Sequence, residues 1–81
     1  MIDKHRSPKI DRYIGERVSI KVSYGMYFGV LDYADGRYFM NKPEYRSNKG
    51  EYHRWAKWSF RKSHVNISNI RIIGDAVVSK I

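Results

Sequence analysis

Apolar and polar residues alternate with a period of two over most of the chain, a pattern that predicts half-buried β-strands. The clearest case is the segment 18–23, where Val or Ile alternates with Ser or Lys. Four further segments carry β-branched or aromatic residues between turn signals, and we expect strands at 26–33, 37–41, 55–62 and 65–73. The pattern therefore predicts a mainly β fold with five short strands.

A short helix is predicted ahead of the first strand, at about 7–15. Ser7 can cap a helix N-terminus, and Pro8 fits the first turn, where its missing N–H is no loss. Two isoleucines four residues apart lie on one face of such a helix, and Gly15 is a common residue just after a helix end. We therefore expect a helix that packs one apolar face against the strands.

Glycines and one long polar segment indicate how the strands are connected. Gly29 lies inside the second predicted strand and suggests a bend or bulge, as a sheet needs where it curls. The segment 41–55 is polar and basic, which is typical of a long exposed loop or an extended hairpin tip. Residues 74–81 are expected as a tail whose apolar run is able to add an edge. The prediction is a short helix followed by a strongly bent five-stranded antiparallel sheet, a small barrel of the SH3-like or OB type.

The length allows a single domain that covers residues 1–81. A chain of 81 residues and 9.6 kDa has a marginal core, and such domains often gain stability by oligomerising. It contains no cysteine, which excludes disulfides and cysteine-ligated metal sites. No apolar run approaches the roughly 20 residues that span a bilayer, and the charged N-terminal segment lacks the apolar core of a signal peptide. We therefore expect a cytoplasmic protein that does not associate with a membrane.

The charge of the chain narrows the choice of partner. Sixteen Lys and Arg residues against eight Asp and Glu residues give a net charge of +8 and a pI near 9.9. A small domain with this charge usually has a polyanionic partner, most often nucleic acid, and no amphipathic basic helix favours a membrane surface instead. Aromatic residues make up 15% of the chain. Cations and flat rings together bind the phosphates and bases of single-stranded nucleic acid, although a small core also needs aromatic mass.

The sequence contains no arrangement typical of an enzyme. His5, His53 and His64 are scattered and lack the spacing of metal ligands. There is no Gly-rich phosphate loop and no nucleophile motif. Asp32 and Asp35 lie three residues apart at a strand end, where they suit turn chemistry better than acid–base catalysis. We therefore expect neither catalysis nor a metal or other cofactor.

The first half of the chain resembles the first motif of the Sm-like superfamily, which includes the eukaryotic Sm and Lsm proteins and bacterial Hfq. The matching positions are an alternating apolar strand, two glycines, a leucine and an aspartate: Val18, Ile20, Val22, Gly25, Gly29, Leu31 and Asp35. The pair Phe39-Met40 is similar to the apolar strand that follows in the family. The resemblance covers about residues 8–73, apart from the segment 41–55.

Several positions depart from the family pattern. The two glycines are one residue closer together than usual, Arg37 stands where a base-stacking aromatic residue is expected, and Phe39 replaces an Asn, with Asn41 just beyond. The second motif is open to two interpretations. The run 60–62 resembles the Sm version, whereas the run 62–64 resembles the Lys-His pair of Hfq with one residue inserted.

The resemblance implies a helix-capped barrel that assembles edge to edge into a homo-oligomeric ring of six or seven subunits. In the family both motif loops line the pore of the ring, where single-stranded RNA binds, and uridine- or adenine-rich RNA is the expected ligand. Carried onto this sequence, the candidate RNA-binding residues are Arg37, Tyr38, Asn41, Arg61, Lys62 and His64. Asp35 is expected to orient its loop by hydrogen bonds. A ring would repeat these cations in every subunit and concentrate positive potential at the pore.

The basic segment 41–55 is a further candidate contact. Its cations are Lys42, Arg46, Lys49 and Arg54. They suit non-specific, salt-sensitive contacts to a nucleic-acid backbone, and a solvated loop is the equally simple interpretation. Trp58 is expected in the core, whereas Trp55 is a candidate stacking platform or subunit contact.

Two other function classes stay open. One is an SH3-like barrel that acts as a protein-interaction or structural module, with Tyr38, Tyr45 and Trp55 forming a peptide groove. The other is a monomeric barrel that places Trp55 and its basic residues on duplex DNA. Ring formation separates the RNA-binding hypothesis from the DNA-binding one, and nucleic-acid affinity that falls with salt separates both from the protein module.

Overall fold

Seven antiparallel strands form one sheet in the computed structural model, which describes residues 3–74. The elements are α1 (Pro8–Asp11), β1 (Arg17–Val22), β2 (Gly25–Ala34), β3 (Arg37–Asn41), β4 (Glu44–Ser47), β5 (Tyr52–Arg54), β6 (Lys57–Phe60), the 3-10 helix η1 (Ile67–Asn69) and β7 (Ile70–Ile72). The predicted mainly β fold with one short N-terminal helix is confirmed. The prediction of five strands is not, because β4 and β5 form within the segment 41–55, which was expected as a loop.

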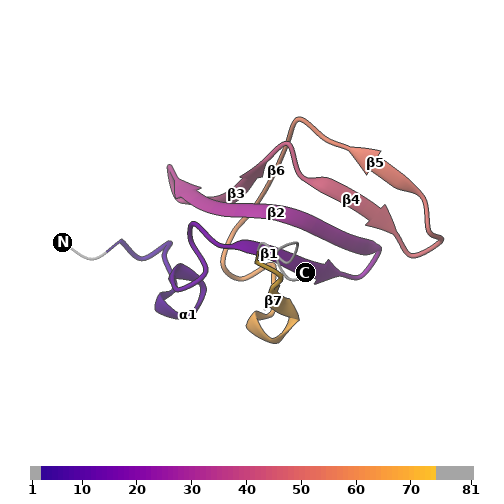
Figure 1. Cartoon of the computed structure of the whole chain (residues 1–81). Coiled ribbons are helices and arrows are strands. Elements are labelled where there is room, and N and C mark those ends of the chain that lie inside the picture. The colour runs from indigo at the N-terminus through magenta and orange to yellow at the C-terminus, as the bar shows by residue number, and fades with distance from the viewer. Residues whose placement is uncertain (1–2, 75–81) are drawn as a thin grey trace.

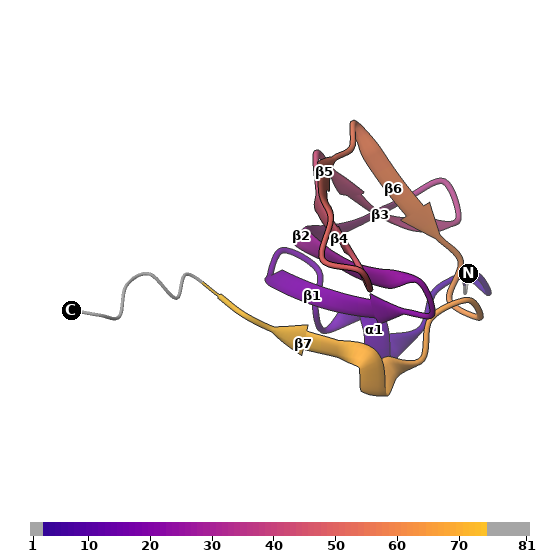
Figure 2. The same cartoon turned by 90° about the vertical axis from the view of Figure 1, so that its right-hand side faces the viewer.

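The sheet is strongly curved but stays open within the described residues. The path of hydrogen-bonded neighbours is β5-β4-β2-β1-β7, and β3 pairs with both β2 and β6. Strand β2 is long enough to pair with β4 along its first half and with β3 along its second half (Figure 1). On their other sides, β3 pairs with β6 and β4 pairs with β5. Figure 2 shows the resulting curl, with β7 and β1 at the bottom and β5 and β6 at the top. No strand in the part of the chain that the structure describes pairs with the outer sides of β6 and β7, so a closed barrel is not confirmed.

A one-residue bulge at Lys42 divides the long strand that pairs with β2. On one side Leu31 pairs with Met40, and on the other Phe28 pairs with Glu44. Two residues of β2 therefore face the three residues 41–43, and Lys42 takes the left-handed conformation with φ of 51°. The irregularity expected at Gly29 is therefore present opposite Gly29, but the extra residue is Lys42, which lies on the strand that pairs with β2.

The N-terminal helix is shorter than the sequence predicted. It contains only Pro8–Asp11, and the Ser7 side chain makes no capping hydrogen bond. Beyond α1 the chain turns, and Ile14 forms an isolated parallel bridge with Leu31. Four helical residues do not form a stable helix alone, so the position of α1 depends on its contacts with the sheet.

The last predicted strand is also shorter. Of the segment 65–73, only β7 forms a strand, and it pairs with β1 through Val18 opposite Ile72 and Ile20 opposite Ile70. Helix η1 precedes it, and the Asn66 side chain accepts a hydrogen bond from the Ser68 N–H to cap that helix. The expected apolar edge in the tail lies outside the described residues.

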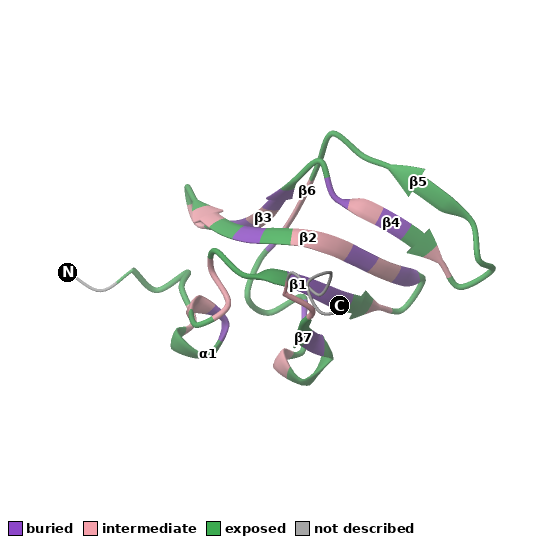
Figure 3. Cartoon of the chain, in the orientation of Figure 1, coloured by how far each residue is buried: buried purple, intermediate pink, exposed green. Residues whose placement is uncertain are grey.

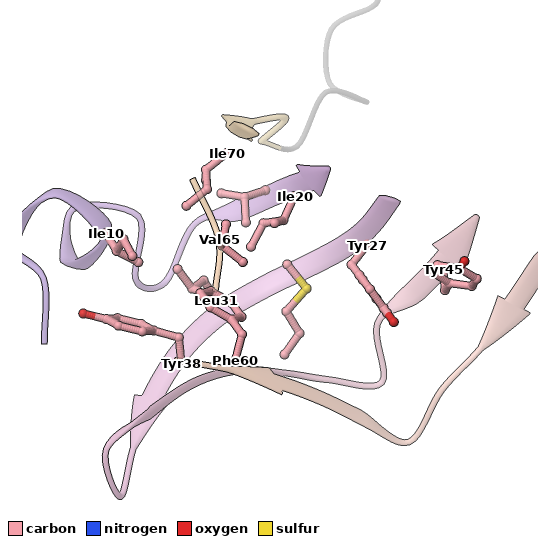
Figure 4. Packing of buried hydrophobic residues seen from close by; sticks show 11 residues of the cluster. Ile10, Ile20, Tyr27, Leu31, Tyr38, Tyr45, Phe60, Val65 and Ile70 are labelled. Atoms are coloured by element: carbon pink, nitrogen blue, oxygen red, sulfur yellow. The ribbon is translucent and has the colours of Figure 1, made fainter. Parts of the chain in front are cut away.

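The core lies inside the curl of the sheet and is unusually rich in tyrosine. Its buried members are Ile10, Val18, Ile20, Tyr27, Leu31, Tyr38, Met40, Tyr45, Phe60, Val65 and Ile70. Figure 4 shows this cluster extending from Ile10 on α1 to Tyr45 on β4. Trp58, which was expected in the core, is half-buried, and in the same predicted strand Phe60 is buried whereas Ala56 is exposed. No helix among the described residues is long and apolar enough to cross a membrane.

Candidate nucleic-acid interface

The turn between β2 and β3 is a tight two-residue turn formed by Asp35 and Gly36. Both have positive φ, 52° and 79°, and the pair Ala34–Arg37 closes the hairpin. Two successive residues with positive φ are typical of a type I′ turn, for which Asp-Gly is a favoured sequence. Within residues 3–74 the Asp35 carboxylate makes no hydrogen bond, so Asp35 shapes the turn through its backbone.

The register between β3 and β6 brings two basic segments together. Tyr38 pairs with Phe60, so Arg37 and Arg61 each lie one residue beyond this pair, at the same end of the sheet. Both side chains are exposed. Lys62 follows directly, and we call Arg37, Arg61 and Lys62 the basic end. The structure thus unites residues from the two motifs that the sequence analysis treated separately.

The N-terminal segment 3–7 lies against the basic end. The Lys62 ammonium group donates hydrogen bonds to the backbone oxygens of Lys4 (2.6 Å) and Arg6 (3.3 Å). The Tyr33 hydroxyl group donates to Oδ2 of Asp3 at 2.7 Å, and the Arg6 guanidinium lies 4.4 Å above the Tyr33 ring. These contacts add Lys4, His5 and Arg6 to the basic end. The sequence analysis did not name these three residues as candidates for binding. The pattern that could have identified them is the run of three adjacent side chains that carry or can carry a positive charge.

Tyr38 belongs to the core and does not present a ring to a ligand. Its side chain is fully buried, and its hydroxyl group bonds to Asp11 and to the backbone of Ser7. Burial, with a smaller contribution from the hydrogen bond to Asp11, raises the pKa of Tyr38. Tyr38 was named as a candidate RNA-binding residue, and its burial corrects this assignment because the ring is not accessible to a ligand. Tyr38 instead joins α1 to β3 directly below Arg37.

Two other predicted residues do not sit together as one site. Asn41 is exposed and pairs with Lys57, at the opposite end of β3 from Arg37. His64 closes the turn after β6 by donating its backbone N–H to the Arg61 oxygen at 2.8 Å. His64 is therefore near the basic end, and Asn41 is not.

The cations of the β4–β5 hairpin are exposed but dispersed. Arg54 forms an ion pair of 3.3 Å with Glu44, the residue opposite it. Arg46 lies on the same face because it is two residues from Glu44, whereas Lys42 occupies the bulge and Lys49 the tip. Figure 3 shows that β5 is exposed along its whole length. These four side chains form a basic rim around the hairpin and not one cluster.

A pocket of about 460 Å³ lies between strands β1 and β6, which are not hydrogen-bonded neighbours. Its walls come from four segments: 21–24 at the end of β1, 58–60 on β6, 64–66 in the following loop, and Asn69 on η1. His64 and Asn66 thus line one side, and Tyr24 lines the other. Sequence reasoning missed the pocket because its walls come from segments that are distant along the chain.

The described residues contain no group of three or more His, Cys, Asp or Glu side chains placed to hold a metal ion. Comparisons with protein-family models, with curated proteins and with solved structures found no match for this chain.

Proposed function

We propose that this protein binds single-stranded RNA through the basic end, as an Sm-like domain that assembles into a homo-oligomeric ring. The observation that carries the proposal is the β3–β6 register, which places Arg37 beside Arg61 and Lys62. Guanidinium groups pair with phosphates and also stack on bases, so such a cluster is suited to an unpaired strand. Phosphate contacts supply most of the affinity and make it sensitive to salt.

The ring is supported by the free edges at β6 and β7, two of the three strands, with β5, that have a neighbour on one side only among the described residues. Strand β7 has β1 on one side, and β6 has β3 on one side, while the other sides of both are unpaired among the described residues. Exposed edges favour pairing with another chain, and a head-to-tail contact between β6 of one copy and β7 of the next uses both edges in every subunit. Such a ring repeats the basic end around its axis.

The burial of two tyrosines weakens the peptide-groove alternative. That alternative needs Tyr38, Tyr45 and Trp55 on one accessible surface, and both tyrosines are buried in the core. Of these three aromatic residues, only Trp55 is exposed, with 40% of its surface accessible. The burial of these tyrosines does not argue against the duplex-DNA alternative, so a duplex DNA is included in the test below.

The RNA-binding part of the proposal is tested by fluorescence anisotropy with a short uridine-rich RNA, an adenine-rich RNA and a duplex DNA. We expect RNA to bind more tightly than the duplex, and Arg37→Ala with Arg61→Ala to weaken RNA binding at least about tenfold. Arg17→Ala is the matched control, because it removes one exposed cation from the start of β1. Parental affinity in the double variant, or preference for the duplex, would overturn the assignment.

The ring is tested separately by the mass of the nuclease-treated protein in light scattering. We expect a discrete species of six or seven copies of the 9.6 kDa chain. A proline at Ser59 on β6 or at Arg71 on β7 removes a backbone donor from an edge strand and should abolish this species. A monomeric parent protein would contradict the ring, whether or not it binds RNA.

A further inference from the structure

A group of aromatic rings outside the basic end lies on one face of the β4–β5 hairpin. Tyr45 pairs with His53, and Trp55 follows His53 by two residues, so these three side chains share one face of the ribbon. The Tyr45 ring centroid is 6.2 Å from that of His53 and 5.5 Å from that of Trp55. Tyr24, from the β1–β2 turn, approaches the same ring at 5.9 Å. We call Tyr24, Tyr45, His53 and Trp55 the aromatic face.

Two further rings, the buried Tyr27 and the half-buried Trp58, hold the aromatic face in place. Tyr27 lies beneath it, with its centroid 4.8 Å from Tyr45 and 5.4 Å from Trp55. Trp58 stacks on the other side of Tyr27 at 3.9 Å with an interplanar angle of 8°. Above this support, Tyr24 is 51% and Trp55 40% exposed, although both are large and apolar. Rings that are already ordered lose little conformational entropy when a flat ligand stacks on them.

The charge around the aromatic face indicates the chemistry of its ligand. Lys21 borders the pocket beside Tyr24, and Lys42 and Lys49 lie at the bulge and at the tip of the hairpin. The other two cations of the segment, Arg46 and Arg54, alternate with Tyr45 and His53 and therefore lie on the opposite face of the ribbon. A cationic peptide would be repelled here, whereas a polyanion with flat apolar groups satisfies both features. Single-stranded nucleic acid is that polyanion, because its bases expose faces that a duplex keeps stacked.

The pocket between β1 and β6 connects this surface with the basic end. Tyr24 and Trp58 line its walls together with His64, which closes the turn after Arg61. Asn66 and Asn69 also line it, and asparagine side chains are able to bond base edges. An extended strand that binds at the basic end therefore has a recessed path toward Tyr24.

We propose that the aromatic face is a second RNA subsite, at which unpaired bases stack on Tyr24 and Trp55 while their phosphates contact Lys21 and the lysines at the bulge and tip of the hairpin, Lys42 and Lys49. This inference rests on the proposed function, since both take single-stranded RNA as the ligand. It assigns base stacking to the hairpin and most of the phosphate binding to the basic end.

The first test compares exposed aromatic residues on the two faces of the hairpin. Trp55→Ala and Tyr24→Ala should each weaken binding of a uridine-rich RNA by about tenfold, and Trp55→Phe should retain most of the affinity. Tyr52→Ala is the matched control: Tyr52 is 60% exposed on β5, which ends one residue before Trp55, but it pairs with Arg46 on the opposite face. A circular dichroism melt of each variant shows whether it remains folded. Equal losses for Tyr52→Ala and Trp55→Ala in folded protein would overturn the subsite.

Salt dependence separates stacking from phosphate binding. Trp55→Ala should leave the slope of log affinity against log salt unchanged, because stacking releases no counterions. Arg61→Ala should make that slope shallower by a little under one unit. A shallower slope in Trp55→Ala would mean that Trp55 only positions cations, and would overturn the stacking role.

Fluorescence reports directly on Trp55. The chain has two tryptophans, so Trp58→Phe leaves Trp55 as the only one and keeps a ring against Tyr27. RNA should quench this fluorescence, and a strand of the same length without bases should not. RNA binding without quenching would overturn the aromatic subsite and leave the proposed function standing. Absence of RNA binding at moderate salt would overturn both.

Discussion

The hydroxyl group of Tyr38 on β3 donates a hydrogen bond of 2.6 Å to Oδ1 of Asp11 on α1. The Tyr38 hydroxyl oxygen in turn accepts a hydrogen bond from the Ser7 N–H at 2.7 Å, and the Arg6 side chain pairs with the Asp11 carboxylate at 3.2 Å. A helix of four residues cannot hold its own position, so this network attaches the N-terminal segment to the sheet. The basic end includes residues of that segment, and its shape therefore depends on Tyr38.

Tyr38→Phe should lower the free energy of unfolding by about 1–2 kcal/mol, because the half-buried Ser7 N–H and Asp11 carboxylate lose a partner. Urea denaturation measures the loss. Tyr52→Phe is the control, since the Tyr52 side chain is exposed and should tolerate the change. If both variants match the parent protein, the hydroxyl group of Tyr38 does not secure α1.

Gly25→Ala should destabilise the fold because β4 crosses very close to β2 at this point. A Cβ atom at Gly25 would lie within 2.4 Å of the Arg46 backbone oxygen and 2.8 Å of the Tyr45 ring. We expect a loss of about 1–3 kcal/mol in urea denaturation. At Gly29 the nearest atom would be the flexible Met40 sulfur at 3.3 Å, so Gly29→Ala should cost less. Equal stability of the two variants would contradict the close approach.

Asp35 should be replaceable by glycine but not by valine. The turn needs positive φ, which glycine adopts freely, whereas a β-branched residue is strained by about 1–2 kcal/mol in that conformation. Thermal unfolding of Asp35→Gly and Asp35→Val measures the difference, and RNA affinity should be parental in Asp35→Gly. A large loss of affinity in folded Asp35→Gly would show that the carboxylate itself acts on the ligand.

Stability should fall at alkaline pH because several tyrosines keep their protons in the fold. Burial raises the pKa of Tyr27 and of Tyr38, and burial together with the hydrogen bond to Asp3 raises the pKa of Tyr33 to about 12. In the unfolded chain tyrosine ionises near pH 10, so above this pH the unfolded state binds fewer protons and the free energy of unfolding decreases.

The stability that these protonated tyrosines contribute is fully present below about pH 10. It is lost as the pH rises toward the pKa values that the tyrosines have in the folded protein. Urea midpoints measured between about pH 9 and about pH 11 should decline, and Tyr38→Phe should decline less steeply than the parent. A flat profile over this interval would contradict the raised pKa values.

Local patterns predicted the parts of the fold that local chemistry forms. The strand at 37–41 and the Asp35-Gly36 turn were found where expected, because alternation and positive φ depend on neighbouring residues. Strands β4 and β5 were not predicted. Strand β5 is exposed throughout and has no apolar alternation, so its extended shape comes from pairing with β4.

The candidate site also combines residues that the sequence predicted with residues that only the structure revealed. Arg37, Arg61, Lys62 and His64 were named from the sequence, and the register of two strands places them at or beside one end of the sheet. Tyr38 was assigned to the ligand by analogy of position, whereas the structure buries it in the core together with Met40. The role of the segment 3–7 was missed because its contacts join residues about thirty or sixty positions apart.

By itself, the sequence determined the strand periodicity, the tight Asp-Gly turn, the excess of positive charge and the supply of aromatic rings. The tertiary structure alone decided which of those groups meet. The bulge at Lys42 aligns β4 with β2, this alignment brings Tyr24 to Tyr45, and the β3–β6 register brings Arg37 to Arg61. Register and bulge position depend on packing across the whole sheet, so no local pattern of residues encodes them.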